Sequence, residues 1–353
     1  MTAADRSRNG ASRLVGLEQP VEWEASLAGL PHAFGHTWAS CFAMSLTTAA
    51  PTHLYVWETG RGRAVLPFVI RSFCGAQDIL TPYGFGGFVG EGDCSGLAED
   101  WRTYATDQGY VAGFIGLNPL LGLSSPFPAE ERFTYNQVYQ LDLGKSEEDL
   151  YAALTENRKR QVQAYRRGEL VLIRDGGRCA EFLLEHVHAF FAERGASPVY
   201  QLSRATIEAI IALPNVLLVG AGSGADVQAV CVLAYTQPVA EYFLALSVPA
   251  GRRFSAALVW ESTRILREQG VRWFNLGGGV AAGDGIAQFK ERFGADVRPL
   301  RCLKQVYDEE KYRALCVAAG CDPKVRDGYF PPYHRPAGAL QASMTTSHGG
   351  QPP

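Results

Sequence analysis

The chain has 353 residues and a formal net charge of −3, and 47 % of its residues are hydrophobic. That length and apolar content suffice for one large or two ordinary domains with complete cores. The slight acidity argues against a globally basic nucleic-acid-binding protein, so any site for a polyanion has to be local.

Eight cysteines are scattered, mostly within apolar stretches, without C-x-x-C or a Cys/His cluster at zinc spacing. We expect them to be reduced core residues. The N-terminus lacks the apolar core of a signal peptide, and no apolar stretch approaches the roughly 18–20 residues of a membrane span. We therefore expect a cytoplasmic protein without an integral membrane segment.

Both ends, residues 1–20 and 337–353, are small, polar and rich in Gly, Ser or Pro, which predicts disorder. Between them, a first unit, 21–145, is predicted to begin with a helix over 33–46. HLYVWE and AVLPFVIRS then predict a β-hairpin around the turn TGRGR. The glycine-rich stretch ILTPYGFGGFVG follows, and a helix near 97–108 and strands at GYVAGFIGL and QVYQLDL complete the unit.

A second unit, 146–336, repeats this order. It predicts a helix over 147–167, the strand ELVLIRD, helices over 179–194 and 203–212, and a meander of NVLLVGAG, VQAVCVLAY and AEYFLALS. The helix AALVWESTRILREQG and the strand VRWFNLG close the cycle. Each half shows a helix, an antiparallel hairpin, a Gly-containing loop, a helix and a strand, which predicts an α+β fold of two units side by side. A ligand site is expected in the cleft between them.

The loop after the meander, SVPAGRRFSAALVW, has the composition of an anion site. Arg252 and Arg253 precede a helix predicted to begin near Ser255, where free backbone N–H groups point toward the same place. This geometry suits a phosphate or pyrophosphate of a cofactor or charged carrier. The alternative is an ordinary serine N-cap with solvated arginines.

A second basic segment is LTENRKRQVQAYRRGEL, whose positive residues are Arg158, Lys159, Arg160, Arg166 and Arg167. A stripe of apolar and tyrosine residues along this helix leaves them on the opposite face and at the helix end. They suggest a polyanionic partner, such as a nucleotide-linked substrate or an RNA backbone. The alternative is a solvated surface.

Two glycine-rich stretches remain. In ILTPYGFGGFVG, Tyr83 lies among glycines that either wall a cleft or form a bulged, aromatic turn. In RWFNLGGGVAAGDGIAQFKERFG, three consecutive glycines imply a tight turn, a close contact or a ligand on bare backbone, because glycine has an entropic cost. If Phe289 and Phe293 face the core, Lys290 projects beside them, toward the cleft or toward solvent.

Several well-known motifs are missing from the sequence. It has no G-x-G-x-x-G after a strand, no G-x-x-x-x-G-K-[ST], no G-x-S-x-G and no H-E-x-x-H. The pairs His32/His36 and His186/His188 have no carboxylates or cysteines near them in a metal-binding pattern. We therefore expect no metal site and no hydrolase chemistry of these types.

In combination, TPYGFGG, N-R-K-R-x-x-x-x-Y-R-R-G-E-L, N-L-G-G-G, F-K-E-R-F-G-A and G-Y-F-P-P-Y-H-R resemble the Fem-like branch of the GNAT acyltransferase superfamily, which includes the FemAB peptidoglycan-bridge enzymes. The resemblance spans about residues 30–335. It implies two tandem GNAT-like units, each a mixed, mostly antiparallel sheet flanked by helices, with a substrate channel near their junction.

Members of this branch form amide bonds by attack of an acceptor amine on an activated acyl group. The resemblance implies an N-acyltransferase with no bound cofactor, whose co-substrate is acyl-CoA or aminoacyl-tRNA. Where the CoA-binding signature R-x-x-G-x-G/A has glycine, this loop reads Arg253-Phe254-Ser255-Ala256-Ala257. The helical hairpin of some tRNA-using relatives is also missing. The donor therefore stays open between the two.

The resemblance also implies roles for single residues. Lys290 is expected to bind a substrate anion or stabilise the oxyanion of the reaction. Transfer is direct, and either Glu241 or Tyr242, only one of which faces the cleft, takes the amine proton or orders a water that does. The residues expected to bind substrate are Tyr83, Arg158, Asn275, Gly277, Gly278 and Arg292. Those expected to hold phosphates of the donor are Arg252, Arg253 and Ser255.

The expected acceptor is the amine of a peptidoglycan precursor or of a small molecule. Charged tRNA is a further candidate partner, and DNA is not expected. One alternative is a non-catalytic GNAT-scaffold module that binds an anionic ligand or a protein partner. Another is an RNA-binding regulator built around the basic helix.

Overall fold

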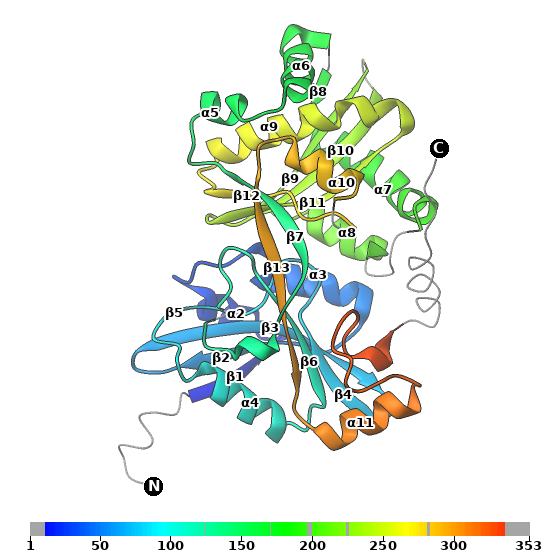
Figure 1. The fold of residues 1–353 in the computed structure, drawn as a ribbon. Helices are drawn as coiled ribbons and strands as arrows, with labels where there is room; N and C mark the ends of the chain where they lie inside the picture. Colours follow the sequence, from blue (N-terminus) through cyan, green and yellow to red (C-terminus); the bar gives the residue numbers. More distant parts are fainter. Residues whose placement is uncertain are drawn as a thin grey trace.

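The computed structural model describes residues 11–123, 125–169, 171–195, 200–223, 226–280 and 283–335. Within them the chain forms two α+β units (Figure 1), and one mixed sheet runs through both. The strand order is β1-β2-β3-β4-β6-β13-β7-β12-β11-β10-β9-β8, with β5 paired to β3 at the side. The predicted α+β class is confirmed.

The elements follow the chain in alternating groups. The strands are β1 (Ala11–Gly16), β2 (Thr52–Glu58), β3 (Gly62–Phe73), β4 (Ala76–Leu80), β5 (Val89–Gly92), β6 (Ala112–Leu117), β7 (Arg132–Asp142), β8 (Val171–Ile173), β9 (Val216–Ser223), β10 (Asp226–Tyr235), β11 (Val239–Ser247), β12 (Trp273–Asn275) and β13 (Asp296–Val306). The helices are α2 (Pro20–Leu27), α3 (Trp38–Thr48), α4 (Leu97–Asp107), α5 (Glu147–Ala152), α6 (Glu156–Ala164), α7 (Gly176–Glu193), α8 (Arg204–Ile211), α9 (Ser255–Glu268), α10 (Gly285–Glu291) and α11 (Glu309–Ala318). Short helical turns include η1 (Phe34–His36), η5 (Pro249–Phe254) and η6 (Pro332–His334).

The first unit is built around the hairpin of β2 and β3, which the sequence predicted. Aromatic residues of this hairpin face α4 across the core. Trp101 of α4 is fully buried against the rings of Tyr55, Phe68 and Phe88, with centroids 4.9–5.9 Å away. Edge-to-face aromatic packing of this kind fixes the position of the hairpin and of the loop that follows it.

The meander β9, β10 and β11 of the second unit is covered on both sides. Helices α5, α6, α9 and α10 pack on one side, here called the α9 face, and α3, α7 and α8 pack on the other, the α7 face. Because both faces are buried, β10 carries a nearly unbroken apolar run. Helix α3 comes from the first unit, and its Thr47 forms a 2.7 Å hydrogen bond with Thr206 of α8. The two units are therefore tied together beside the meander.

Strands β7 and β13 join the units, as their course in Figure 1 shows. Strand β7 pairs with β12 of the second unit and with β13, and the last part of β13 pairs with β6 of the first unit. The chain then returns to the first unit, where Tyr312 and Tyr333 pack with Val111 and Val306. The predicted boundary between residues 145 and 146 stays a prediction.

Some predictions about the elements are wrong. The predicted disorder of residues 1–20 fails from Ala11, because Ala11–Gly16 pairs with β2 as an antiparallel strand; residues 1–10 and 337–353 lie outside the described residues. The predicted helix 147–167 is two helices, α5 and α6. Thr155 between them donates its N–H to the carbonyl of Arg292, 3.1 Å away.

The sequence did not predict β13 or α11. None of the described helices is both long and apolar enough to cross a membrane.

Candidate functional site

Three buried polar residues lie side by side at the junction of the units. Glu241 of β11 pairs in register with Asn275 of β12, which pairs with Gln140 of β7. Cross-strand partners point to the same side of a sheet. Their chain neighbours Phe274 and Leu141 belong to the core on the α9 face, so these three residues point to the opposite side. We call them the polar row; each is at most 2 % exposed.

The polar row contains polar atoms without hydrogen-bond partners. Asn275 Oδ1 accepts the N–H of Gly277 at 2.8 Å. Neither Glu241 Oε1 nor the two amide atoms of Gln140 has a partner among the described residues. Leaving a buried polar group unbonded costs about 1–3 kcal/mol. Several such atoms in one row make it a candidate binding site.

Glu241 faces the glycine-rich loop between β4 and β5. A Cβ built on Gly84, whose φ is +116°, would lie 3.9 Å from Glu241 Oε2. Tyr83 is close enough to interact with this carboxyl, and burial together with Tyr200 and Glu241 raises the pKa of its hydroxyl. Burial also raises the pKa of Glu241 to about 8. A carboxyl that titrates near neutral pH is suited to accept and release protons.

The loop over Glu241 is held at several points. His36 Nε2 donates to the carbonyl of Gly87 at 3.1 Å, and Asn118 Nδ2 donates to the carbonyl of Phe85 at 2.7 Å. Gly87 has φ +104°, and a Cβ there would lie 2.1 Å from the carbonyl oxygen of Gly116. Glycine is required at this position because the backbones nearly touch. The loop thus forms a fixed wall beside Glu241.

The choice between Glu241 and Tyr242 has a geometric answer. Tyr242 packs in the core on the α9 face, with its ring 6.2 Å from that of Phe274. Burial raises the pKa of its hydroxyl well above the usual value. Only Glu241 faces the glycine-rich loop between β4 and β5, so the structure places Tyr242 away from the polar row. The role of either residue in a reaction stays a prediction.

Lys290 reaches the glycine triplet from α10. It is 9 % exposed, and its Nζ donates to the carbonyl of Gly278 at 2.6 Å. Burial lowers its pKa to about 8. Gly277 has φ +74°, and a Cβ on Gly278 would lie 2.5 Å from the carbonyl oxygen of Gln137. The triplet therefore combines a tight turn with a close backbone contact, two of the three explanations that the sequence left open.

Strands β11 and β12 separate just beyond the polar row. They pair at three registers only, the last being Glu241 with Asn275. Strand β11 continues to Ser247 with β10 on one side. On its other side, no strand of the described residues pairs with this last part of β11. Glu241 thus lies at the closed end of an opening in the sheet, and the turn that holds Lys290 continues from the β12 side.

The guanidinium of Arg158 packs against other residues of the protein. Its guanidinium lies 4.3 Å from the ring centroid of Phe289 and 5.0 Å from that of Phe293, and Nη2 donates to the carbonyl of Phe289. Burial and the neighbouring Arg292, which is exposed, lower its pKa to about 10. These contacts fix α10 and so the position of Lys290. The predicted binding roles of Arg158 and Arg292 are untested.

The helix predicted to begin near Ser255 does begin there, but the N–H of Ser255 is not free. The turn η5 precedes α9 directly, and the Ser255 N–H donates to the carbonyl of Arg252 instead of lying free. Arg252 and Arg253 are exposed, and among the described residues neither forms an ion pair. Arg253 lies 4.7 Å from the ring centroid of Phe254. The two guanidinium groups remain candidates for phosphate binding, as predictions.

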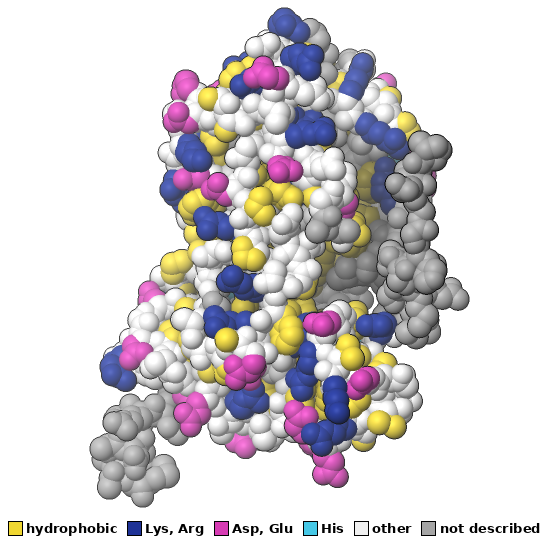
Figure 2. Space-filling view, viewed as in Figure 1, with side chains coloured by type: hydrophobic (Ala, Val, Ile, Leu, Met, Phe, Trp, Pro, Cys, Tyr) yellow, Lys and Arg dark blue, Asp and Glu magenta, His cyan; other side chains and the backbone are white. Residues whose placement is uncertain are grey.

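The basic helix is partly neutralised by its own surroundings. Figure 2 shows Lys and Arg side chains gathered on the end of the molecule that α6 occupies in Figure 1. Lys159 pairs with Glu156 at 2.9 Å, and Arg166 pairs with Glu147 at 2.7 Å. These pairs favour the solvated-surface alternative for this segment.

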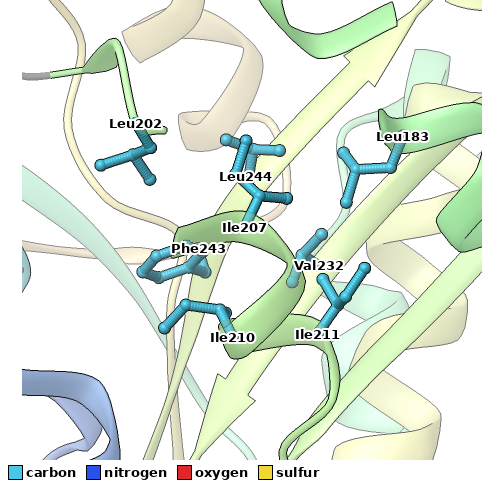
Figure 3. Close-up of a pocket in the computed structure, with 8 residues that line it drawn as sticks. All are labelled: Leu183, Leu202, Ile207, Ile210, Ile211, Val232, Phe243 and Leu244. Atoms are coloured by element: carbon cyan, nitrogen blue, oxygen red, sulfur yellow. The ribbon is translucent and has the colours of Figure 1, made fainter. Parts of the chain in front are cut away.

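A cavity lies between α7, α8 and the meander (Figure 3), but its chemistry is that of a core. Its volume is about 10 Å³, roughly the minimum for one water. The side chains around it are all apolar: Leu183, Leu202, Ile207, Ile210, Ile211, Val232, Phe243 and Leu244. Among the described residues, no group of three or more His, Cys, Asp or Glu side chains is arranged to hold a metal ion.

Gln140 is the member of the polar row that the sequence analysis missed. It lies in QVYQLDL, where Tyr139 and Leu141 are buried on the α9 face. An amide side chain between two apolar residues of a strand is the signal that was available, because alternation turns it to the other face.

No family model matches the sequence, and no curated protein matches it either. Solved structures do match. FemX shares 10 % identity with the chain, with 86 % of this chain and 99 % of FemX covered at a TM-score of 0.64. The C-terminal domain of an Agrobacterium fabrum protein assigned as a lysylphosphatidylglycerol synthetase shares 15 % identity, with 82 % and 91 % covered at a TM-score of 0.54.

A Bacteroides thetaiotaomicron protein of unknown function shares 10 % identity, with 84 % of this chain and 99 % of that chain covered at a TM-score of 0.54. The chain therefore has a Fem-like fold, and the fold that the resemblance implied is confirmed.

Proposed function

We propose that this protein is an N-acyltransferase that passes an acyl or aminoacyl group directly from an activated donor to an amine bound at Glu241. The observation that carries the proposal is the buried Glu241 carboxyl, which has an oxygen without a partner among the described residues and lies where β11 and β12 separate. The Fem-like fold supports the reaction class by analogy, since FemX has this fold.

The acceptor reaches the site as an ammonium at neutral pH. Burial keeps the empty Glu241 carboxyl largely protonated at neutral pH, and the bound cation lowers its pKa, so that Glu241 releases its proton to solvent. The resulting carboxylate then takes one of the protons of the ammonium, directly or through an ordered water. The free amine then attacks the acyl carbonyl carbon, a C–N bond forms, and the bond from that carbon to the thioester sulfur or ester oxygen breaks. The second proton lost by nitrogen goes to the leaving group or to solvent. No bond to the enzyme is formed.

Lys290 is proposed to act on the donor side. A lysine whose pKa is lowered to about 8 remains largely charged at neutral pH. Its Nζ, which now donates to the carbonyl of Gly278, has further hydrogens for a substrate anion or for the oxyanion that forms during attack.

Acyl-CoA is the donor that the geometry favours. Beyond Glu241, over about 20 Å, no strand of the described residues pairs with this edge of β11, which suits an extended chain that itself contains amides. That edge leads to η5, where Arg252 and Arg253 are exposed and suit phosphates. Aminoacyl-tRNA is the second donor, because the Fem-like resemblance includes enzymes that use it.

A thermal-shift comparison tests the donor. Purified protein is heated with acetyl-CoA, with acetyl-pantetheine, which lacks the phosphates, and with aminoacylated tRNA at constant ionic strength. A donor present at 100 times its dissociation constant stabilises the fold by about 2.7 kcal/mol. We expect acetyl-CoA to raise the melting temperature, with the gain reduced in Arg252→Ala/Arg253→Ala. Stabilisation by charged tRNA alone, lost after RNase treatment, would replace acyl-CoA as the donor, and no stabilisation by any donor would contradict the proposal.

A further inference from the structure

Gln140 is the member of the polar row that the proposed reaction does not use. It is 1 % exposed, and it lies on β7, two strands away from Glu241. Its Nε2 and Oε1 both lack partners among the described residues, whereas buried side-chain amides normally have at least one. Its neighbour Asn275 already uses Oδ1 to accept the N–H of Gly277. A ligand is therefore the natural partner of the Gln140 amide.

The chemistry of a primary amide limits that ligand. Gln140 presents a donor and an acceptor side by side in one plane. A second amide, edge to edge, satisfies both atoms at once. A carboxylate or phosphate offers acceptors only, so Oε1 of Gln140 would stay unbonded.

The charges around the row also disfavour an anion. Among the described residues, no Lys or Arg side chain has a hydrogen bond or ion pair with any member of the row. Lys290, which reaches the turn after β12, already donates to the carbonyl of Gly278. A bound ammonium favours the ionised form of the Glu241 carboxyl, whereas a bound anion disfavours it. The row thus suits a cation at Glu241 and a neutral polar group at Gln140.

We propose that the polar row selects acceptors that have an uncharged amide a few bonds from the reacting amine, and that Gln140 is the residue that recognises this amide. Adjacent strands lie about 4.8 Å apart, so the backbones of Glu241 and Gln140 are separated by about 10 Å, with Asn275 between them. Both side chains are long enough to lean toward the centre of that span. This inference rests on the proposed function, which supplies the amine at Glu241.

The test uses binding, so that it needs no donor. Three probes share an amine and a short chain but end differently: β-alaninamide in an amide, β-alanine in a carboxylate and propylamine in a methyl group. Their affinities for the full chain are measured by isothermal titration calorimetry, together with those for Gln140→Met. Methionine keeps the approximate size of glutamine without its donor and acceptor.

We expect the wild type to bind β-alaninamide about tenfold more tightly than propylamine, the gain from a pair of neutral hydrogen bonds, and β-alanine most weakly. In Gln140→Met the preference for the amide disappears. The melting temperature of this variant stays the same or rises, because two buried atoms without partners are removed.

The proposal is overturned if propylamine or β-alanine binds the wild type as tightly as β-alaninamide, if none of the probes binds, or if Gln140→Met keeps the amide preference. The order of the three affinities for the wild type tests the proposal even if the variant is unstable. An amide preference in a protein that transfers no acyl group from any donor would refute the proposed function and leave the amide site standing. Acyl transfer to amines, with no preference for amines that contain an amide, would support the proposed function and refute the amide site.

Discussion

Glu241 and Asn275 form the last pair between β11 and β12, and beyond this pair the two strands separate. This places a buried carboxyl at the closed end of an opening in a sheet that is otherwise continuous. On the β12 side, the chain turns through the glycine triplet, where Gly278 holds Lys290. Glu241, with a raised pKa, thus lies on the β11 side of this opening, and Lys290, with a lowered pKa, is held by the turn on the β12 side.

Lys290→Met is expected to lower turnover by roughly 10²–10³-fold, the usual effect of losing one group that stabilises an oxyanion. The melting temperature changes little, because burial already disfavours the charged amine. Steady-state kinetics and calorimetry of the same preparation measure both. Lys311→Met, at an exposed lysine of α11, is the control. Parallel losses of stability and turnover in Lys290→Met would show that the lysine is only structural.

Arg158→Met is expected to lower the free energy of unfolding by about 1–3 kcal/mol, because the guanidinium loses its contacts with Phe289 and Phe293 and its hydrogen bond. Arg160→Met, at an exposed position of the same helix, is expected to be neutral. Urea unfolding compares the two. If Arg158→Met instead leaves stability unchanged and raises KM for the donor, the arginine binds an anion, as the sequence first suggested.

Gly278→Ala is expected to destabilise the protein by about 1–3 kcal/mol, because its Cβ would lie 2.5 Å from the carbonyl oxygen of Gln137. Gly285→Ala, on the first turn of α10, meets no atom within 4 Å, and alanine there stabilises by up to about 1 kcal/mol. Denaturant unfolding of both variants tests the contact. Equal stabilities would contradict the close approach of the two backbones.

Glu241 gives the stability of the fold a characteristic dependence on pH. Its folded pKa of about 8 lies above the unfolded value of 4.5, so between these values the folded state holds a proton that the unfolded state has lost. Stability therefore falls as pH rises from 4.5 to 8 and this contribution is constant above 8. Glu241→Gln removes the fall, and its advantage over the wild type grows to the order of a few kcal/mol at pH 8. Parallel stability curves for both proteins over this range would contradict the raised pKa.

The sequence predicted the parts of the site that depend on local order. The meander and the helix after it follow from periodicity. So does the pair of Phe289 on α10 and Phe293 just beyond its end, four residues apart, whose rings lie 5.3 Å apart as the spacing suggested. The position of Lys290 beside them follows from the same helix geometry. The side on which Glu241 lies does not, because both faces of β11 are buried and a bulge interrupts its pairing with β10.

Other features depend on contacts between distant segments. Gln140 joins the polar row only through the register of β7 with β12, which no local pattern encodes. Strand β13 escaped prediction because its first part is exposed, contains Pro299 and is rich in charge. The start of α9 at Ser255 was correct, but Pro249 begins a short helical turn before it that occupies the Ser255 amide. Helix propensity therefore predicted α9, but it could not show that the preceding turn would bond the Ser255 N–H; phosphate binding by Arg252 and Arg253 stays a prediction.

The most direct test of the proposed reaction is the titration of the Glu241 carboxyl by NMR with ¹³C-labelled glutamate, assigned by the signal lost in Glu241→Gln. We expect a midpoint near pH 8 in the free protein, as burial raises this pKa to about 8, and a midpoint at lower pH when β-alaninamide or another acceptor amine is added. A carboxyl that is already ionised at pH 5, or one whose midpoint does not respond to any amine, would contradict the role of Glu241 as the group that receives the acceptor.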